Sequence, residues 1–367
     1  MNGTIYMPVG EVCSSISDTY REKKNMVTLI NTSDVLEGRV LNHERVPNSN
    51  LKGQFKKTFQ RDDILYSEIR PQNRRFAYVD FSPIDYIAST KLMVIRAKKD
   101  VVSPKYLYYF LKNSSTVAEL QLLAETRSGT FPQITFSEVA NLTIPVPSLA
   151  VQEVIVQTMQ CLEDKITCNE QINDNLQQQA QAIYSSMFID NPDPAWSHGH
   201  LSDLITVKYG KDHKKLADGI YPVYGSGGIM RYVERPLYNK ESVLIPRKGT
   251  LNNVMYVNQP FWSVDTMFYT EMKLPNVAKF VYHFVKAKDL VSMNAGSAVP
   301  SMTTDILNAM EVVIPSASAL EEFESLVAPM YEAMEANDVQ SKALSQMRDT
   351  LLPKIMSGEI DVSAVQL

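Results

Sequence analysis

Asp265, Glu271 and Lys273 stand in the string VDTMFYTEMK at 264–273, and their types could do chemistry. Two carboxylates near a lysine can hold Mg²⁺ and orient a water molecule for phosphodiester hydrolysis. The pattern is short and frequent, no proline precedes it, and an ordinary strand with a charged end gives the same string. A self-contained Mg²⁺-dependent DNA endonuclease therefore remains one interpretation of the chain.

Other common reactive motifs are absent from the sequence. The GSGG string at 225–228 is not followed by Lys and Ser or Thr, and there is no GxSxG, HExxH or GxGxxG motif. The adenine methyltransferase tetrad, an Asn or Asp followed by two prolines and an aromatic residue, is missing as well. Cys13, Cys161 and Cys168 form no CxxC pair. We therefore predict no catalytic residue, no metal site and no cofactor bound by this chain.

Basic and amide side chains gather in the first half of the chain, where they could contact DNA. Arginine and lysine neutralise phosphates, and Arg, Asn and Gln also make paired hydrogen bonds to guanine or adenine edges. The string RPQNRR at 70–75 supplies these types in one turn. The candidate DNA-binding residues of this half are Lys56, Lys57, Arg61, Arg70, Gln72, Asn73, Arg74, Arg75 and Thr130.

A second group follows in YGSGGIMRY at 224–232 and PRKGTLNN at 246–253. Glycine there permits close approach of a backbone, and the basic and amide side chains offer donors. The candidates of this half are Tyr224, Ser226, Arg231, Arg247, Lys248, Thr250, Asn252, Asn253 and Ser297. Basic turns are usually only solvated, but their recurrence at matching places in both halves favours binding.

An internal duplication explains that recurrence. DILYSEIRPQNRRFAYVD (63–80) resembles SVLIPRKGTLNNVMYVN (242–258), and KYLYYFL (105–111) matches KFVYHFV (279–285). SGTFPQIT (128–135) matches AGSAVPSMT (295–303), and both halves continue into a proline-ended string, NLTIPVPS or EVVIPSAS. The order is the same in both halves, which indicates a repeat with a period near half the chain length.

Each proline-ended string introduces a segment with a heptad pattern, and positions in the two segments differ by 168. Asn169 and Asn337 share one step of the pattern, and a buried Asn fixes the register of a helix pair. We therefore expect two helices of about 36 residues, each roughly 54 Å long, paired antiparallel. Separate packing of each helix on its own domain is the alternative. The expected seam comprises Ile155, Leu162, Ile166, Asn169, Leu176, Ile183, Phe323, Val327, Met334, Asn337, Leu344 and Leu351.

Charge and composition fit this organisation. The chain has 367 residues, enough for two domains, and a net charge of −5. Both helical segments are acidic, with net charges of −5 over 148–190 and −6 over 316–367, so the two bodies carry +6 and could take an anionic partner. No window approaches eighteen apolar residues, and the start lacks a basic and then apolar region. We expect a cytoplasmic protein without a membrane partner.

This arrangement resembles the specificity subunit of type I restriction-modification systems. The resemblance rests on two variable bodies, the IPVPS and VIPSAS strings, the loops at 129–132 and 296–300, and the tail LLPKIMSGEI at 351–360. It covers nearly the whole chain and is closer in the second half. The first helix departs from it, since SSMFIDNP replaces the tail motif there. Glu321 or Glu322 also stands where a Gln is expected after the second proline string.

The resemblance implies a fold and a function. The fold is α+β and internally duplicated, with two strand-rich target-recognition domains (1–147 and 191–315) separated by two long antiparallel coiled-coil helices (148–190 and 316–367). Each domain would recognise one half of a split sequence in double-stranded DNA, and the helices would set the gap. In that family two methylation subunits carry S-adenosylmethionine and the adenine chemistry, and ATP-driven, Mg²⁺-dependent endonuclease subunits can join. This chain would be non-catalytic, and a pure protein-binding scaffold is a third reading.

Overall fold

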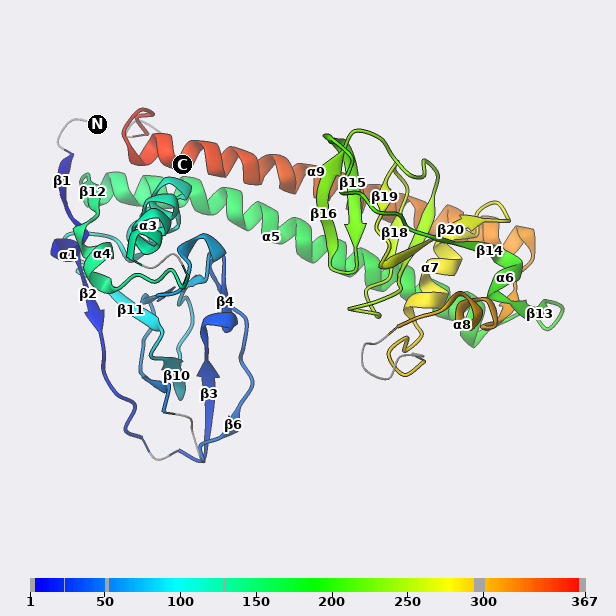
Figure 1. Ribbon diagram of the computed structural model, residues 1–367, viewed down its shortest axis with the longest axis horizontal. Helices are drawn as coiled ribbons and strands as arrows, with labels where there is room; N and C mark the ends of the chain where they lie inside the picture. The colour runs from blue at the N-terminus through cyan, green and yellow to red at the C-terminus, as the bar shows by residue number, and fades with distance from the viewer. Residues whose placement is uncertain (1–3, 23, 50–52, 128–129, 294–300, 363–367) are drawn as a thin grey trace. The chain divides into compact units, whose positions relative to one another are not determined.

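The computed structural model describes residues 4–22, 24–49, 53–127, 130–293 and 301–362. Its contacts group the chain into two compact units, Met1–Cys168 with Val339–Leu367, and Asn169–Asp338. Each unit thus contains one strand-rich body and parts of both long helices, α5 (Leu149–Ser185) and α9 (Ala317–Met356). Figure 1 labels many of the elements.

The central sheet of the first unit has the strand order β2-β11-β8-β9. The strands are β2 (Cys13–Ile16), β11 (Leu92–Ala97), β8 (Ile64–Ser67) and β9 (Phe76–Tyr78), all paired antiparallel. The apolar and aromatic run ILYS of β8 is buried along its whole length, as expected of an interior strand. Strand β1 (Ile5–Pro8) pairs separately with β12 (Thr143–Val146).

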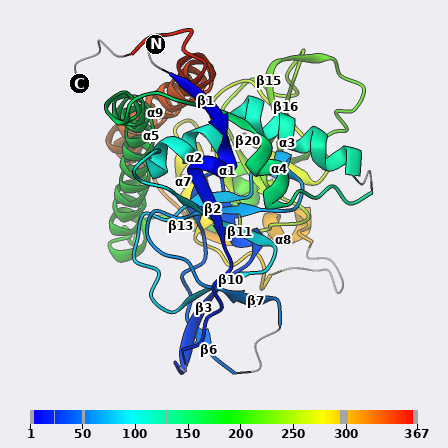
Figure 2. The same ribbon diagram turned by 90° about the vertical axis from the view of Figure 1, so that its left-hand side faces the viewer.

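A second sheet and several short elements complete the first body. The sheet has the order β6-β3-β10-β7, formed by β6 (Val46–Pro47), β3 (Met26–Ile30), β10 (Tyr86–Ser89) and β7 (Phe55–Lys57). Figure 2 looks onto this body and shows β3, β6 and β7 at the end away from β1. The short elements are α1 (Val9–Val12), η1 (Thr32–Asp34), β4 (Val35–Leu36), β5 (Arg39–Val40) and η2 (Pro71–Asn73).

Three helices follow the sheets of the first body. Helix α2 (Pro104–Lys112) begins with a proline, whose fixed φ suits the first helical position, and it buries its aromatic residues. Helix α3 is Ser114–Arg127. Helix α4 (Phe136–Asn141) starts with a capping box in which the Glu138 carboxylate accepts from the Thr135 backbone at 2.7 Å.

The second unit repeats this order of elements. Its central sheet β14-β20-β17-β18 consists of β14 (Ile205–Tyr209), β20 (Met267–Met272), β17 (Ser242–Pro246) and β18 (Met255–Val257). Strand β13 (Ser197–His200) pairs with β21 (Glu311–Ile314), as β1 does with β12. A three-stranded sheet has the order β16 (Gly228–Val233), β15 (Asp218–Gly225), β19 (Trp262–Ser263). The helical elements are η3 (Ser186–Asp190), α6 (Leu201–Leu204), α7 (Ala278–Lys286) and α8 (Thr304–Asn308).

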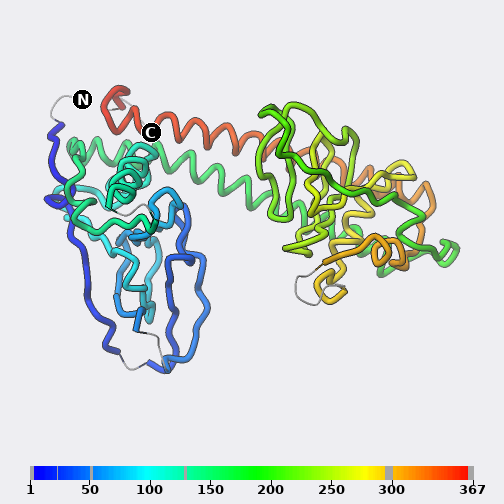
Figure 3. The backbone as a smooth tube through the Cα atoms, viewed as in Figure 1, coloured from blue at the N-terminus to red at the C-terminus, as the bar shows by residue number. Residues whose placement is uncertain are grey.

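The long helices lie antiparallel in each unit, and Figure 3 shows the red end of α9 beside the start of α5 in the first unit. The first unit packs Ile155 and Met159 of α5 in one core with Leu352 and Ile355 of α9. In the second unit Asn169 donates to the Asn337 carbonyl at 3.4 Å, and Asn173 donates to the Met334 carbonyl at 3.3 Å. The expected α+β fold with two antiparallel long helices is therefore confirmed.

Candidate nucleic-acid interface

The loop between β8 and β9 presents the RPQNRR string on the first body. The one-turn element η2 is flanked by Arg70 and Arg74, both in the left-handed region with φ of 43° and 52°. Such values cost a residue with a side chain of order 1 kcal/mol or more, and they occur often at functional sites. The Gln72 backbone N–H donates to the Gln121 side chain of α3 at 3.1 Å, and the Arg70 N–H donates to the Pro132 carbonyl at 3.1 Å. These two hydrogen bonds from the loop backbone therefore fix the conformation of the loop.

The predicted residues of this loop divide into exposed and internally bonded ones. Arg70, Gln72, Asn73 and Thr130 are exposed. Arg75 is half-buried, and its guanidinium donates to the Ser33 carbonyl at 2.9 Å.

Arg74 is also half-buried and lines a small cavity with Glu37, Lys112 and Arg348. The exposed face of the loop therefore consists of Arg70, Gln72 and Asn73, with Arg74 and Arg75 turned into the unit.

The other basic candidates of the first body lie on different elements. The Lys57 ammonium donates to the carbonyls of Thr90 at 3.1 Å and Leu92 at 2.8 Å, and burial lowers the pKa of this lysine. Lys56 is exposed on β7, and Arg61 is exposed three residues before β8, whereas η2 follows the other end of that strand. Arg61 and η2 are thus separated by the length of β8.

Sequence reasoning missed Lys91. Its ammonium lies 3.4 Å from a Glu68 carboxylate oxygen and donates to the Gln133 side chain at 3.1 Å. Gln133 also forms a bridge with Ile69, beside Arg70. Lys91 is thus a further exposed cation near the loop. It stands in the ordinary strand end STKL, in which no basic cluster indicates a binding residue.

In the second body the matching loop follows β17, where Arg247 lies against Tyr209. The Arg247 guanidinium carbon is 5.3 Å from the centre of the Tyr209 ring, and Arg247 Nη1 donates to the Asp265 carbonyl at 3.3 Å. The Arg247 carbonyl accepts from the Met302 N–H at 2.9 Å. Arg247 is therefore held in place by stacking and by its backbone, and Tyr209, which is 52% exposed, also escaped the sequence reasoning.

The turn between β15 and β16 joins this loop. Asn253 donates from its side chain to the Ser226 carbonyl at 2.8 Å. Gly249 has a φ of +87°, and a Cβ there would lie 2.8 Å from the Ser226 hydroxyl oxygen. Glycine is therefore required for the two turns to meet. Lys248, Thr250 and Asn252 are exposed beside them.

Three further candidates are placed elsewhere or outside the description. Tyr224 is buried, and its hydroxyl accepts from the Gln259 amide at 3.3 Å. Arg231 forms an ion pair with Asp218 at 2.7 Å and donates to the Leu216 carbonyl. Ser297 lies outside the described residues.

The two candidate loops occupy equivalent places in the duplicated sheets. Each follows the third strand of a four-stranded antiparallel sheet, β8 or β17. Each is bridged to the segment before α4 or α8, through Ile69 and Gln133 in the first body and Lys248 and Ser301 in the second. We call Arg70, Gln72, Asn73 and Thr130 the first recognition surface, and Arg247, Lys248, Thr250 and Asn252 the second. Arg247 is half-buried, and the other members are exposed.

The residues that suggested a nuclease do not form a site. Asp265 precedes β20, whereas Glu271 and Lys273 lie at its other end, so about 20 Å of extended chain separates the carboxylates. Glu271 pairs with Lys208 at 3.6 Å, and the Lys273 ammonium donates to the Ser202 carbonyl at 2.6 Å. In the part of the chain that the structure describes, no group of three or more His, Cys, Asp or Glu side chains could hold a metal ion.

Every predicted residue of the seam between the long helices is at least half-buried, and Ile155, Asn169, Phe323 and Val327 are fully buried.

None of the described helices has the length and apolar character needed to cross a bilayer.

Comparison with known proteins agrees with this architecture. The chain is 26% identical to the type I restriction enzyme HindI specificity subunit of Haemophilus influenzae, over 91% of this chain and 94% of that protein. It is 25% identical to the type I restriction enzyme MjaIX specificity subunit of Methanocaldococcus jannaschii, over 77% of this chain and 76% of that protein. The solved type I restriction-modification S subunit from M. genitalium has a similar fold, with a TM-score of 0.56 and 17% identity over 99% and 98% of the two chains.

A chain from a solved structure on complex assembly in the type I restriction-modification system also has a similar fold, with a TM-score of 0.50 and 15% identity over 98% and 99% of the two chains. The sequence profile of the type I restriction modification DNA specificity domain matches residues 6–178 and again 195–323. The two matches account for most of the chain and repeat in the same order as the two bodies, so the chain belongs to the family of type I restriction-modification DNA specificity proteins.

Proposed function

We propose that the chain is the non-catalytic specificity subunit of a type I restriction-modification system and recognises a split target in double-stranded DNA. The observation that carries the proposal is the pair of recognition surfaces, which present arginine and amide side chains from equivalent loops of a duplicated sheet. Arg70 and Arg247 are suited to guanine edges, and Gln72, Asn73 and Asn252 are suited to adenine edges. The relatives named as specificity subunits support the same function.

The proposal includes the four-part division predicted from the sequence. Residues 1–147 and 191–315 form the two target-recognition domains, and 148–190 and 316–367 form the helical spacers. The antiparallel helices set the unrecognised gap between the two half-sites. Inserting one heptad in both helices at once should therefore change the permitted gap, and an unchanged gap would exclude this role.

The proposal assigns the chemistry to partner subunits. Two methylation subunits bind S-adenosylmethionine and transfer the methyl group, and endonuclease subunits, where present, use ATP and Mg²⁺. The chain itself supplies the address. The separation of Asp265 from Glu271 supports this assignment over a self-contained nuclease. Incubating the purified chain and DNA with Mg²⁺ alone should give no cleavage.

The decisive test is methylation sequencing of DNA from a host that expresses the chain with its methylation subunit, against a host that lacks only this chain. Methyl-adenine at a split motif is expected only when the chain is present. Arg70→Ala should relax recognition of one half-site and Arg247→Ala that of the other, each by about 1–3 kcal/mol. The untouched half-site is the internal control of each variant. Equal losses of affinity for specific and random DNA would mean that both arginines contact only phosphates.

A further inference from the structure

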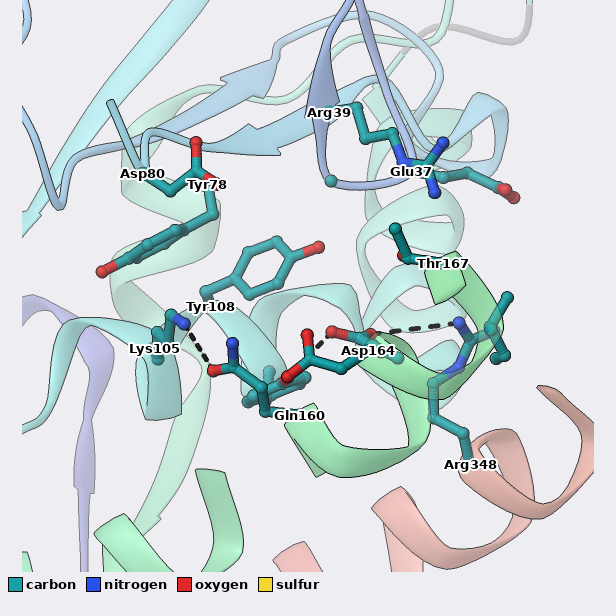
Figure 4. Close-up of a pocket in the computed structure, with 14 residues that line it drawn as sticks. Glu37, Arg39, Tyr78, Asp80, Lys105, Tyr108, Gln160, Asp164, Thr167 and Arg348 are labelled. Carbon is teal, nitrogen blue, oxygen red and sulfur yellow. Dashed lines mark hydrogen bonds and ion pairs between the residues drawn. The ribbon is translucent and has the colours of Figure 1, made fainter. Parts of the chain in front are cut away.

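A cavity of about 230 Å³ lies within the first unit, between β9, α2 and α5 (Figure 4). The turn between β4 and β5 and Arg348 of α9 complete its wall. Charged and tyrosine side chains from these elements converge on it, and neither recognition surface contributes to it. The side chains used below are Glu37, Tyr78, Asp80, Lys105, Tyr108 and Asp164.

The hydroxyl of Tyr108 faces this cavity. Tyr108 is only 6% exposed, yet its hydroxyl has no hydrogen-bond partner among the residues that the structure describes. Figure 4 shows its ring between the Tyr78 and Asp80 side and the Asp164 side. Gly38 has a φ of +107°, and a Cβ there would overlap the Tyr108 hydroxyl, so glycine keeps the space open. This oxygen can therefore accept a hydrogen bond from a ligand in the cavity.

Three of the four carboxylates of the lining have no partner among the described residues, whereas the fourth, Glu163, accepts from Tyr109 and pairs with Lys112 and Arg348. Glu37, Asp80 and Asp164 form no side-chain hydrogen bond or ion pair within the described chain. The cations Lys105, Arg39 and Arg348 also line the cavity, and each of them has a partner. The Lys105 ammonium donates to the Gln160 amide oxygen, Arg39 has an interaction of its own, and Arg348 lies 2.8 Å from Asp349. The unmet charge of the cavity is therefore negative.

The equivalent place in the second unit holds a positive charge. Lys279, which matches Lys105 in the repeat, is 5% exposed and pairs with Glu241 at 3.2 Å and Glu324 at 2.6 Å. Its ammonium also lies 5.1 Å and 5.5 Å from the ring centres of Tyr256 and Tyr331. Here the chain's own ammonium satisfies both the carboxylates and the aromatic faces.

Two substitutions between the repeats distinguish the first unit. Asn258 of the second unit closes the gap to α9 by donating to Glu335 at 3.1 Å, and Asp80 stands at the matching position of the first unit. Tyr331 matches Glu163, which already binds Lys112 and Tyr109. In the first unit the matching Lys105 lies 5.7 Å from the centre of the Tyr78 ring and donates to Gln160, but it forms no ion pair with a carboxylate of the described chain, and no amide stands at the Asp80 position.

We propose that this cavity binds an organic cation, a guanidinium or a primary ammonium group, between the carboxylates of Asp80 and Asp164 and against the oxygen and ring of Tyr108. Two sources share this chemistry: a free amine such as a polyamine, and a lysine or arginine side chain of a partner subunit. The second source rests on the proposed function, because it requires a methylation subunit at this face. The first source does not.

Calorimetric titration of the full-length chain with agmatine, which carries both cationic groups, tests the site. Saturable one-to-one binding is expected, and the uncharged analogue butylurea should not bind. The double variant Asp80→Asn, Asp164→Asn should weaken agmatine at least about tenfold, since both carboxylate charges of the proposed site are removed. Tyr108→Phe keeps the packing of the ring and should weaken binding less.

The matched control removes two negative charges elsewhere. Glu119→Gln with Asp174→Asn alters exposed positions outside the cavity and leaves the net charge equal to that of the test variant. Agmatine affinity should stay unchanged in the control. An equal loss in both double variants would mean general charge attraction and would overturn the site.

The source is settled by measuring the affinity of the chain for its methylation subunit with and without agmatine. Competition, together with a weaker complex for Asp80→Asn, Asp164→Asn, assigns the cavity to a partner side chain. Agmatine binding without competition assigns it to a free amine. If agmatine does not bind and the double variant assembles normally, the proposal is wrong, whereas methylation at a split motif would still support the proposed function.

Discussion

The side-chain amide of Asn337 donates a hydrogen bond of 2.9 Å to the side-chain oxygen of Asn173, and so joins two helices at positions 164 residues apart in the chain. Asn173 in turn donates to the Asp338 carboxylate at 2.8 Å. Such a polar layer reduces the apolar packing between the helices but favours one register. A shift by one heptad would leave the amides without hydrogen-bond partners. The layer therefore defines which residues of α5 and α9 face each other in the second unit.

We expect Asn173→Ala and Asn337→Ala each to lower the free energy of unfolding of the second unit by about 1 kcal/mol, with a coupling between them of similar size. Both tryptophans, Trp196 and Trp262, lie in this unit, so tryptophan fluorescence during urea unfolding reports on it alone. Asp174→Ala, at an exposed neighbouring position, should stay within about 0.5 kcal/mol of the parent chain. Strictly additive effects of the two asparagine substitutions would contradict the direct contact.

The ion pair between Lys112 and Glu163 fixes α2 of the first unit on α5. The lysine side chain is 10% exposed and lies 4.6 Å from the centre of the Tyr109 ring, while Glu163 also accepts from the Tyr109 hydroxyl at 2.8 Å. Burial lowers the pKa of Lys112, and the neighbouring carboxylate opposes that shift. The charged form of the lysine therefore depends on Glu163.

Glu163→Gln should destabilise the first unit by about 3 kcal/mol, because it leaves a buried ammonium without its carboxylate. Adding Lys112→Met to this variant should restore most of the loss, since both charges are then gone. Hydrogen exchange of the peptide covering 104–112 measures this unit separately. No recovery in the double variant would show that the loss comes from Tyr109 or Arg348 instead.

Much of this architecture could be predicted from the sequence. The repeat of KYLYYFL as KFVYHFV predicted α2 and α7, and the heptad pattern around Asn169 and Asn337 predicted the long helices. Both patterns are periodic along a short stretch of sequence and can be recognised without tertiary contacts. The matched strings on either side of RPQNRR and RKGTLNN likewise placed both recognition surfaces on equivalent loops.

The direction of individual side chains was beyond such patterns. Arg75 bonds to Ser33 because η1 lies beside β9, a contact between segments about forty residues apart that no periodicity reveals. Tyr209 meets Arg247 only because β14 and β17 both pair with β20, so one faces the other across the end of the sheet. The sequence could name the basic loops, but only tertiary pairing separates the exposed Arg70 from Arg75 and Arg247, which bond within their units.

His283 makes the second unit sensitive to acid. Its ring nitrogens contact the Gln181 side chain at 2.8 Å and the Tyr331 hydroxyl at 3.0 Å, and the ring is fully buried. Burial first, and then the Lys286 charge, lowers the pKa of His283 from 6.5 to about 4. The folded unit therefore keeps the neutral ring, whereas the unfolded chain takes up a proton already near pH 6.5.

It follows that the contribution of His283 is fully present above about pH 6.5 and is lost as the pH falls toward about 4, by up to roughly 3 kcal/mol. Tryptophan fluorescence during urea unfolding at stepped pH measures this slope. His283→Gln keeps a donor and an acceptor but does not titrate, so its slope between pH 6.5 and 4 should be smaller. Identical slopes in the two proteins would assign the acid sensitivity to other groups.

Gly38 carries two separable constraints, its backbone angle and its closeness to Tyr108. With a φ of +107° any side chain is strained, and a Cβ would also overlap the Tyr108 hydroxyl oxygen, while the next atom, Cζ of the ring, would be 3.4 Å away. Gly38→Ala should therefore destabilise the first unit by about 2–4 kcal/mol, of which strain in the backbone accounts for roughly 1–3 kcal/mol. Tyr108→Phe in the same chain removes only the overlapping oxygen, so it should recover the steric part and leave the backbone part.

Gly53→Ala is the control, because a Cβ at that position meets nothing within 4 Å. Hydrogen exchange of the peptide spanning β4, β5 and the turn between them measures each step, and full recovery by Tyr108→Phe would mean that the backbone angle at Gly38 carries no cost.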